Sequence, residues 1–223
     1  MHQNLIQVQI AKRKQAKSNL HSCSPKAPTL DTPVDMIVGL GNPGPKSQRT
    51  RHNAGADFVR ELANSASATL SAETKFFGET ARITLNGRDI RLLVPSTYMN
   101  RSGQAVSAMA KFYQIEPQNI LIAHDELDHS PGTSRLKLGG GHGGHNGLRD
   151  IIKSLGNNKE FARLRIGIGH PGHADQVADY VLKKASKGDQ QLIDNSISDA
   201  LQYLPLAAEG QWEQAMNKLH SVN

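Results

Sequence analysis

Histidine, aspartate and asparagine side chains gather in four polar segments that follow predicted strands or lead into predicted helices. These are residues 41–44, 98–100, 124–128 and 139–147. In open α/β sheets, ligands bind beyond the carboxyl ends of the strands, so we expect the four segments to meet at one edge of a sheet. None of them presents a Ser or Cys in the setting of a nucleophile.

General acid–base chemistry suits these residue types. His52 stands just before a predicted helix, and a neutral imidazole there is suited to take a proton from water. Asp125, at the end of another predicted strand, is suited to hold the ring through its other nitrogen. Asn42, Asn100 and Asn146 are suited to donate to peptide carbonyls or to a developing oxyanion. Together these groups would suffice to hydrolyse an activated bond such as an ester without a metal, but from the residues alone they indicate a site and not its identity.

Each of these residues also has a purely structural interpretation. Asn146 precedes a helix and suits its N-cap, while Asn42 in a Pro-Gly turn suits an Asx-turn. His52 suits a surface or cap position, and Asp125 suits an ion pair with a neighbouring base. From the residues alone these alternatives stay open.

Residues 39–44 match the dinucleotide-binding pattern G-x-G-x-x-G directly after a predicted strand. That motif requires the helix to begin within the glycines, so that its N-terminus meets a pyrophosphate. Pro43 and Pro45, with several further residues before the helix, argue against it. The nucleophile motif G-x-S-x-G is absent from the sequence.

A zinc site is a further alternative, because His142 and His145 share one loop and are expected near His124 and His52. A His-x-x-His pair in a glycine-rich loop is a weak metal signal without an acidic or thiol partner at ligand spacing. We therefore predict no metal and no cofactor.

Strands and helices alternate along the chain after Met36, with one hairpin signal at Asn86-Gly87. This pattern predicts a single α/β domain whose mixed, twisted central sheet is flanked by helices. The expected strands are 36–40, 79–85, 89–95, 119–125, 134–138 and 163–169. The expected helices are 54–63, 102–113, 148–155, 175–182, 191–204 and 212–219. Asn53 and Ser102 are expected helix caps, and Pro205 and Gly210 are expected to break the last helices.

Residues 1–33 differ in composition from the rest, since they are polar, proline-containing and without an acidic residue before Asp31. We expect a disordered basic extension there and a folded domain over 34–223. The formal net charge of the chain is +6. Cys23 is the single cysteine, which excludes a disulfide framework and suits a reducing cytoplasm. No apolar run approaches the roughly 18 residues that span a bilayer, so we expect a soluble protein.

Six ordered strings identify a family resemblance: GLGNPG, TRHNAG, STYMNRSG, HDELD, KLGGGHGGHNGLRDII and RLRIGIGHPG. In this order and spacing they closely resemble the bacterial-type peptidyl-tRNA hydrolase family, from about Met36 to the C-terminus. The resemblance implies a monomeric α/β esterase with a mixed central sheet that recycles transfer RNA from prematurely released peptidyl-tRNA, and the cysteine content predicts a cytoplasmic location.

The resemblance also implies roles for single residues. His52 corresponds to the general base that activates water, Asp125 to the carboxylate that orients it, and Asn42 to a position that favours blocked amino groups. The implied substrate-binding residues are those that hold the peptide and those that lie near the RNA phosphates: Tyr98, Met99, Asn100, His145 and Asn146, and Arg135, Lys137 and Arg165.

One residue departs from the family pattern. Ser47 stands where the family usually has a tyrosine, so a stacking or sealing aromatic ring is replaced by a small hydroxyl. A catalytically silent RNA-binding module and a general small-ester hydrolase remain as alternative functions. The first has no reason to keep all of His52, Asp125, Asn42, Asn100 and Asn146, and the second would cleave esters that lack RNA.

Overall fold

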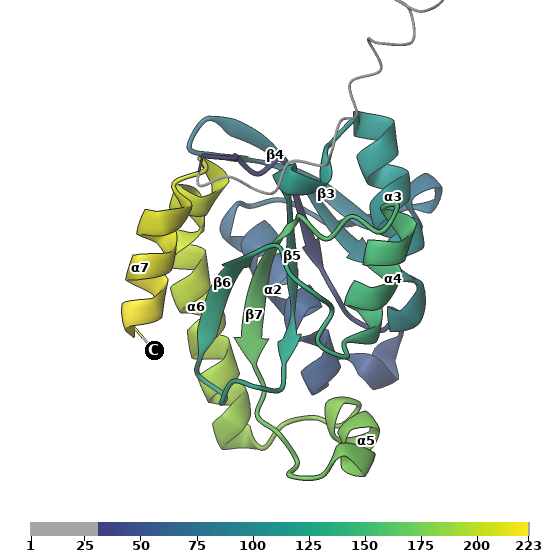
Figure 1. The fold of residues 1–223 in the computed structure, drawn as a ribbon, viewed down its shortest axis with the longest axis vertical. Coiled ribbons are helices and arrows are strands. Elements are labelled where there is room, and N and C mark those ends of the chain that lie inside the picture. Colours follow the sequence, from purple (N-terminus) through teal and green to yellow (C-terminus); the bar gives the residue numbers. More distant parts are fainter. Residues whose placement is uncertain (1–30, 223) are drawn as a thin grey trace, which may run out of the picture.

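The computed structural model describes residues 31–222, which form one mixed sheet covered by helices on both faces (Figure 1). The seven strands lie in the order β2-β3-β4-β1-β5-β7-β6. Strand β1 pairs in parallel with β4 and β5, and β5 pairs in parallel with β7, so these four carboxyl ends share one edge. The strands are β1 Met36–Gly39, β2 Ser71–Glu73, β3 Gly78–Leu85, β4 Arg88–Pro95, β5 Ile120–Glu126, β6 Ser134–Leu138 and β7 Ala162–Gly167. The predicted single α/β domain with a mixed sheet is confirmed, and β2 is an additional strand.

The predicted hairpin is confirmed between β3 and β4. Its turn residues Asn86 and Gly87 have φ angles of 48° and 77°, the left-handed conformations that a two-residue hairpin turn requires. Antiparallel pairing then continues from Leu85 opposite Arg88 to Gly78 opposite Pro95. The hairpin delivers the carboxyl end of β4 to the same edge as that of β1.

Two hydrophobic clusters fill the space on the two faces of the sheet. One packs α2, α6 and α7 against the sheet, and the other packs α3 and α4 against its opposite face. The α-helices are α2 Ala54–Ser65, α3 Ser102–Tyr113, α4 Asn146–Ser154, α5 Val177–Val181, α6 Lys187–Ala208 and α7 Trp212–Val222. In Figure 1 the short α5 stands apart, beyond the arrowheads of β5 and β7.

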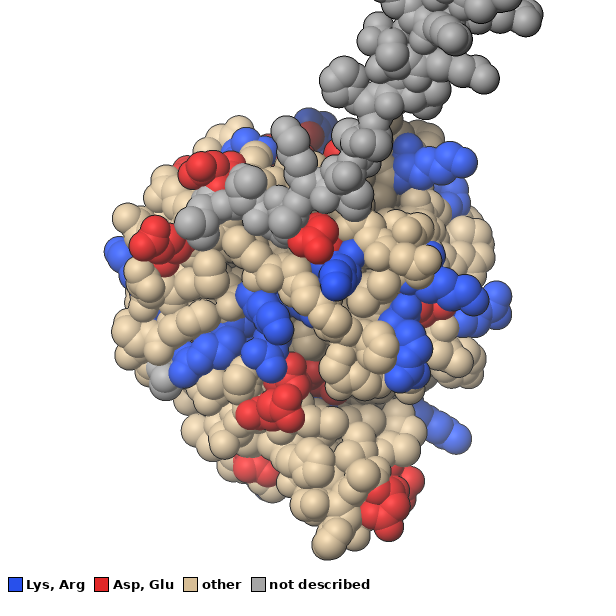
Figure 2. Space-filling model, in the orientation of Figure 1, with Lys and Arg blue, Asp and Glu red and all other residues tan. Residues whose placement is uncertain are grey.

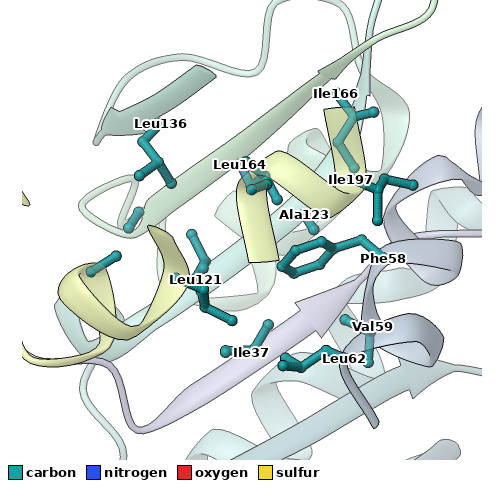
Figure 3. Close-up of a cluster of buried hydrophobic side chains, with 14 of the residues drawn as sticks. Ile37, Phe58, Val59, Leu62, Leu121, Ala123, Leu136, Leu164, Ile166 and Ile197 are labelled. Atoms are coloured by element: carbon teal, nitrogen blue, oxygen red, sulfur yellow. The ribbon is translucent and has the colours of Figure 1, made fainter. Parts of the chain in front are cut away.

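Helix α2 packs unusually close to the central strands. Phe58 is fully buried and lies among Ala123, Leu164 and Ile197 (Figure 3). One turn earlier, a Cβ on Gly55 would collide with the carbonyl oxygen of Ala123 in β5. The glycine thus lets the start of α2 approach β5, two residues before Asp125.

One predicted helix cap and one predicted helix end are wrong, although the predicted helix 102–113 has the bounds of α3. Ser102 is the first residue of α3 and donates its hydroxyl to Met99 O at 2.9 Å, so it is not an N-cap acceptor. Pro205 lies inside α6 rather than ending it. Proline removes one helical hydrogen bond, but the burial of Leu204 and Ala208 on either side holds the helix against the core. The chain turns at Gly210, where φ is 85°.

The predicted extension falls mostly on residues 1–30, which lie outside the described residues. Its last residues contact the domain: Trp212 Nε1 donates to Thr32 O at 2.7 Å, and Asn119 Nδ2 donates to Pro33 O at 2.8 Å. Val34 is fully buried and its N–H donates to Ala208 O. Packing therefore begins a few residues before Met36. Over residues 31–222, no helix combines the length and apolarity of a membrane span.

Candidate active site

A histidine and an aspartate meet at the carboxyl edge of the sheet. His52 lies in the 3₁₀ turn Arg51–Asn53 that leads into α2, and Asp125 is near the end of β5. Nδ1 of His52 lies 2.9 and 3.0 Å from the two carboxylate oxygens of Asp125. Because an ionised carboxylate only accepts, Nδ1 carries the proton and Nε2 is the ring's acceptor. This is the arrangement that orients a general base.

His145 approaches the same carboxylate from the other side. Its Nε2 lies 3.0 Å from Asp125 Oδ1, and its Nδ1 accepts from the N–H groups of Gly147 and Leu148. His145 is therefore the N-cap of α4, and the interpretation of Asn146 as that cap is wrong. Since Nδ1 accepts, the proton sits on Nε2 and is donated to Asp125.

These contacts set the charge states of the pair. Burial alone raises the pKa of Asp125, but the charges and hydrogen bonds of His52 and His145 outweigh it and lower the net pKa. Burial lowers the pKa of His52, but the charge and hydrogen bond of Asp125 outweigh it and raise the net pKa above 6.5. Asp125 is thus ionised at neutral pH, and His52 becomes a neutral base only above its raised pKa.

His124 directly precedes Asp125 in β5, and its imidazole stays uncharged. Burial, and then the charge of His145, lower the pKa of His124 to about 3. Its Nδ1 donates to the carbonyl oxygen of Asp125 at 2.7 Å. The neutral ring supports the Asp125 backbone without competing for its carboxylate.

His52, Asp125 and His145 also have the types and spacing of metal ligands, since one donor atom from each lies within 4.8 Å of the others. A metal would need Nε2 of His145 without its proton, because only a deprotonated nitrogen can bind a cation. The two backbone N–H groups that bind Nδ1 place the proton on Nε2 instead. The arrangement therefore fits a hydrogen-bonded base better than a metal centre.

Asn42 is held by a residue that sequence reasoning took for a helix cap. Asn53 occupies the N-cap position of α2, but its side chain makes no cap hydrogen bond. Instead its Oδ1 accepts from Asn42 N–H and its Nδ2 donates to Asn42 O, both at 2.9 Å. The side-chain Oδ1 of Asn42 accepts from Met99 N–H at 2.8 Å. Asn42 thus keeps its Nδ2 protons for another acceptor.

Replacement of Asn53 by alanine is expected to lower the free energy of unfolding by about 1–3 kcal/mol, because both Asn42 backbone groups lose their partner. The loop that carries the Asn42 amide would then loosen, so KM should rise as well. Denaturant unfolding and steady-state kinetics measure the two effects. Asn64→Ala, an exposed change at the other end of α2, is the control; an Asn53→Ala protein that matched it in both would contradict the clamp.

The glycine-rich segment reaches the site by a route that the sequence pattern did not predict. Strand β6 is antiparallel to β7, so it ends at the edge opposite the site. The expectation that this segment directly follows a carboxyl end at the site edge is wrong, and the loop crosses back to α4.

Arg163, a buried residue of β7 that the sequence analysis missed, donates to the carbonyl oxygens of Gly140 and Gly141. The two-residue spacing of Arg163 and Arg165 in a strand was the available signal, because it places both on one face.

A cavity of about 740 Å³ contains this site, and His52, Asp125, His145 and Asn146 all line it. Among the predicted RNA-contacting cations, Lys137 and Arg165 line it too, and Arg165 Nε donates to Glu126 at 2.7 Å. Arg135 lies opposite Arg165 in the β6–β7 register, and its Nη1 donates to His220 O. Figure 2 shows the Lys and Arg side chains gathered over β6 and β7 on this face.

The remaining predicted residues lie around this cavity rather than inside it. Asn42 lines a neighbouring cavity of about 350 Å³, on the side of α2. Tyr98 is 68% exposed, Met99 is buried, and Asn100 is exposed in the 3₁₀ turn Met99–Arg101 that precedes α3. Ser47 is half-buried, and its carbonyl oxygen accepts from the backbone and hydroxyl of Thr50.

A buried carboxylate paired with an imidazole, at the carboxyl edge of a mixed sheet and in a cavity that Lys137 and Arg165 also line, has the groups that a hydrolase of an anionic substrate would need. The family model described as peptidyl-tRNA hydrolase matches residues 36–223. This chain belongs to the peptidyl-tRNA hydrolase family.

Relatives and solved structures agree with this assignment. The chain is 59% identical over 193 residues to the peptidyl-tRNA hydrolase of Saccharophagus degradans, covering 86% of this chain and 98% of that protein. It is 61% identical over 193 residues to that of Teredinibacter turnerae, covering 86% of this chain and 100% of that protein. The crystal structure of peptidyl-tRNA hydrolase from Acinetobacter baumannii superimposes with a TM-score of 0.82 at 54% identity, covering 84% of this chain and 95% of that one.

Proposed function

We propose that this chain hydrolyses the ester between an N-blocked peptide and the 3′-terminal ribose of transfer RNA, with His52 as the general base. The observation that carries the proposal is the pairing of His52 Nδ1 with the buried carboxylate of Asp125 inside a cavity that cations also line. Family membership supports the substrate class.

In the proposed reaction, water bound at His52 Nε2 gives its proton to the ring as it attacks the ester carbonyl. Asp125 holds the tautomer and stabilises the imidazolium that forms. The proton is then available for the ribose oxygen that leaves. General-base catalysis of this kind contributes roughly 10²–10⁴-fold in rate.

The asparagines are suited to bind the peptide through N–H donors. Asn42 Oδ1 is occupied by Met99 N–H, and Asn146 Oδ1 accepts from Arg149 Nη1 at 2.7 Å. Each amide therefore turns its Nδ2 protons toward other acceptors. We assign Asn42, Asn146 and Asn100 to the peptide carbonyls, with Tyr98 and Met99 beside them.

The cations are assigned to the RNA. Lys137 and Arg165 line the cavity of His52, and Arg135 continues the row across β6 and β7. Phosphate contacts of this kind position the nucleic acid and make binding depend on salt. Ser47 is assigned to the same substrate-binding surface. We place the enzyme in the cytoplasm as a monomer, a state that sedimentation of the purified protein measures.

The test is the release of the N-acetylated amino acid from an N-acetylated aminoacyl-tRNA, with the same esterified RNA bearing a free amino group as the control. Rapid cleavage of the blocked substrate and slow cleavage of the free one are expected. Binding of both RNAs without cleavage would favour the RNA-binding module instead. Turnover of simple chromogenic esters at a comparable rate would favour a general esterase.

A further inference from the structure

One wall of the His52 cavity comes from a segment with few contacts of its own. Residues 174–184, here called the wall segment, include α5 and contribute Ala174, Val177, Ala178 and Val181 to the cavity lining. Within this segment only Val181 is buried, and Leu182 is 53% exposed. A stretch with so little buried apolar surface opens locally at low free-energy cost unless something else holds it.

Arg51, the residue directly before His52, makes most of the polar contacts between the wall segment and the rest of the domain. Tyr180 adds another, since its hydroxyl donates to Ile168 O at 2.6 Å. The Arg51 guanidinium lies over the ring of Tyr180, with the carbon 4.0 Å from the ring centroid. Its Nη1 lies within hydrogen-bond distance of the carbonyl oxygens of Tyr180, Lys183 and Lys184, at 3.3, 3.4 and 3.0 Å. Its backbone N–H donates to Lys183 O at 3.2 Å.

Arginine is well suited to this place. The carbonyls it binds lie at and just beyond the C-terminal end of α5, where helical carbonyls lack partners and carry partial negative charge. The Arg51 side chain is only 10% exposed, so water competes weakly for these bonds. A planar guanidinium both stacks on a ring and donates in its own plane, which a lysine ammonium does not do.

The residue directly before Arg51 makes a second backbone contact with the wall segment. Thr50 forms an isolated antiparallel bridge with Lys184. The 3₁₀ turn Arg51–Asn53 therefore carries the candidate base on one residue and the attachment of the wall segment on the residue before it.

We propose that Arg51 is a positioning residue, which fastens the wall segment over the cavity so that this segment contacts the substrate next to His52. The inference rests on the proposed function for its substrate. It assigns Arg51 to substrate binding through the wall segment, while His52 remains oriented by Asp125.

The experiment compares the full chain with its Arg51→Met variant, which keeps the length of the side chain and removes its donors. With N-acetylated aminoacyl-tRNA, KM should rise about tenfold, because a charged hydrogen-bond set of this kind is lost. The kcat should change by less than about threefold, the signature of lost uniform binding. Hydrogen exchange of the α5 amides should become faster, a readout that does not depend on activity.

Two further variants keep the test decisive. Arg51→Lys retains the charge and should give an intermediate KM even if Arg51→Met folds poorly. Arg82→Met is the control: Arg82 is also an arginine paired with an aspartate, Asp89, but it lines neither cavity. Its KM and α5 exchange should equal those of the wild type.

A cross-link tests whether Arg51 acts through the wall segment. Bridge partners in antiparallel pairs lie within disulfide range. Thr50→Cys and Lys184→Cys, made together with Cys23→Ser, should restore a low KM to Arg51→Met when the disulfide forms, and its reduction should raise the KM again.

Three results would overturn the inference: an unchanged KM with unchanged α5 exchange, a fall in kcat as large as the rise in KM, or no rescue by the cross-link. If the wild-type chain did not hydrolyse the N-acetylated aminoacyl-tRNA, the proposed function would be refuted instead. Hydrogen exchange of the α5 amides in the wild type and in Arg51→Met would still report whether Arg51 holds the wall segment.

Discussion

Replacement of His52 by alanine is expected to lower kcat by roughly 10²–10⁴-fold, the contribution of a positioned general base. Nδ1 is bound to Asp125, which leaves Nε2 as the ring atom that can take the proton from water. The two imidazoles that pack around Asp125 cannot replace it. His145 has both nitrogens engaged, and the pKa of His124 is lowered to about 3 by burial and by the charge of His145.

A second variant separates the loss of the general base from the loss of the hydrogen bond between residue 52 and Asp125. The Nδ2 amide of His52→Asn takes the place of Nδ1 and can still donate to Asp125, so the buried carboxylate keeps its partner, but an asparagine amide accepts no proton at neutral pH. It should therefore lose as much kcat as His52→Ala while keeping more of the stability.

Single-turnover hydrolysis of N-acetylated aminoacyl-tRNA measures the chemical step, and filter binding of the RNA measures retention of the substrate. His173→Ala, an exposed histidine outside the cavity lining, serves as the control and should behave like the wild type. Near-normal hydrolysis by His52→Ala would rule out the assigned base and leave the reaction to another group.

Replacement of Asp125 by asparagine is expected to have an effect of similar size, up to about 10⁴-fold in kcat by analogy with the orienting aspartate of serine proteases. Asp125 Oδ1 accepts from both His52 and His145, and Oδ2 contacts His52 as well. In the variant, the amide nitrogen replaces one oxygen and can donate to His52 Nδ1. That donation would move the ring proton to Nε2, where it blocks the base.

The same substitution should shift the pH dependence. In the wild type, Asp125 raises the pKa of His52 above 6.5 despite the opposing effect of burial. His52 must be neutral to act, so activity should fall as the pH drops through this raised pKa. Without the carboxylate only burial remains, the pKa of His52 falls, and the acid limb should move to lower pH.

Profiles of kcat/KM from about pH 5 to about pH 9 for the wild type and Asp125→Asn measure this shift, since such profiles report the free enzyme. Asp128→Asn is a suitable control, because it neutralises a carboxylate at the mouth of the same cavity that makes no contact with His52. An acid limb that stayed at the same pH in Asp125→Asn would mean that His52 is not the titrating base.

Much of the fold could be predicted because its signals are local. The Asn86-Gly87 turn requires left-handed backbone angles that few residues adopt, so it located the hairpin to the residue. The apolar strings of β1, β5 and β7 have the length and composition of buried strands. Helix α2 could be predicted from the four-residue spacing of Ala54, Phe58 and Leu62, which are all buried.

Predictions that depended on hydrogen-bond partners were less successful. Asn53, Ser102 and Asn146 are all residue types that favour helix caps, but the side chain of none of them caps its helix. The preference of a residue type for helix caps reflects only the hydrogen bonds that its side chain can accept from nearby backbone N–H groups. The backbone of Asn42, brought alongside by the packing of β1 on α2, is the better partner for Asn53. Histidine is not among the usual cap residues, and the N–H groups of Gly147 and Leu148, together with Asp125, determine the tautomer of His145.

The sequence by itself determined the chemical groups and their order: an imidazole, a carboxylate and three amides in strings that resemble one family, placed near the ends of strands. Hydrophobic periodicity reports which face of an element is buried, because burial depends on a residue's own side chain. Strand polarity, register and contacts between distant residues depend on which elements pair, and periodicity does not contain that information. The tertiary structure alone therefore decided that β6 runs away from the site, that Arg163 holds the glycine-rich loop, and that Arg51 joins the wall segment to the turn of His52.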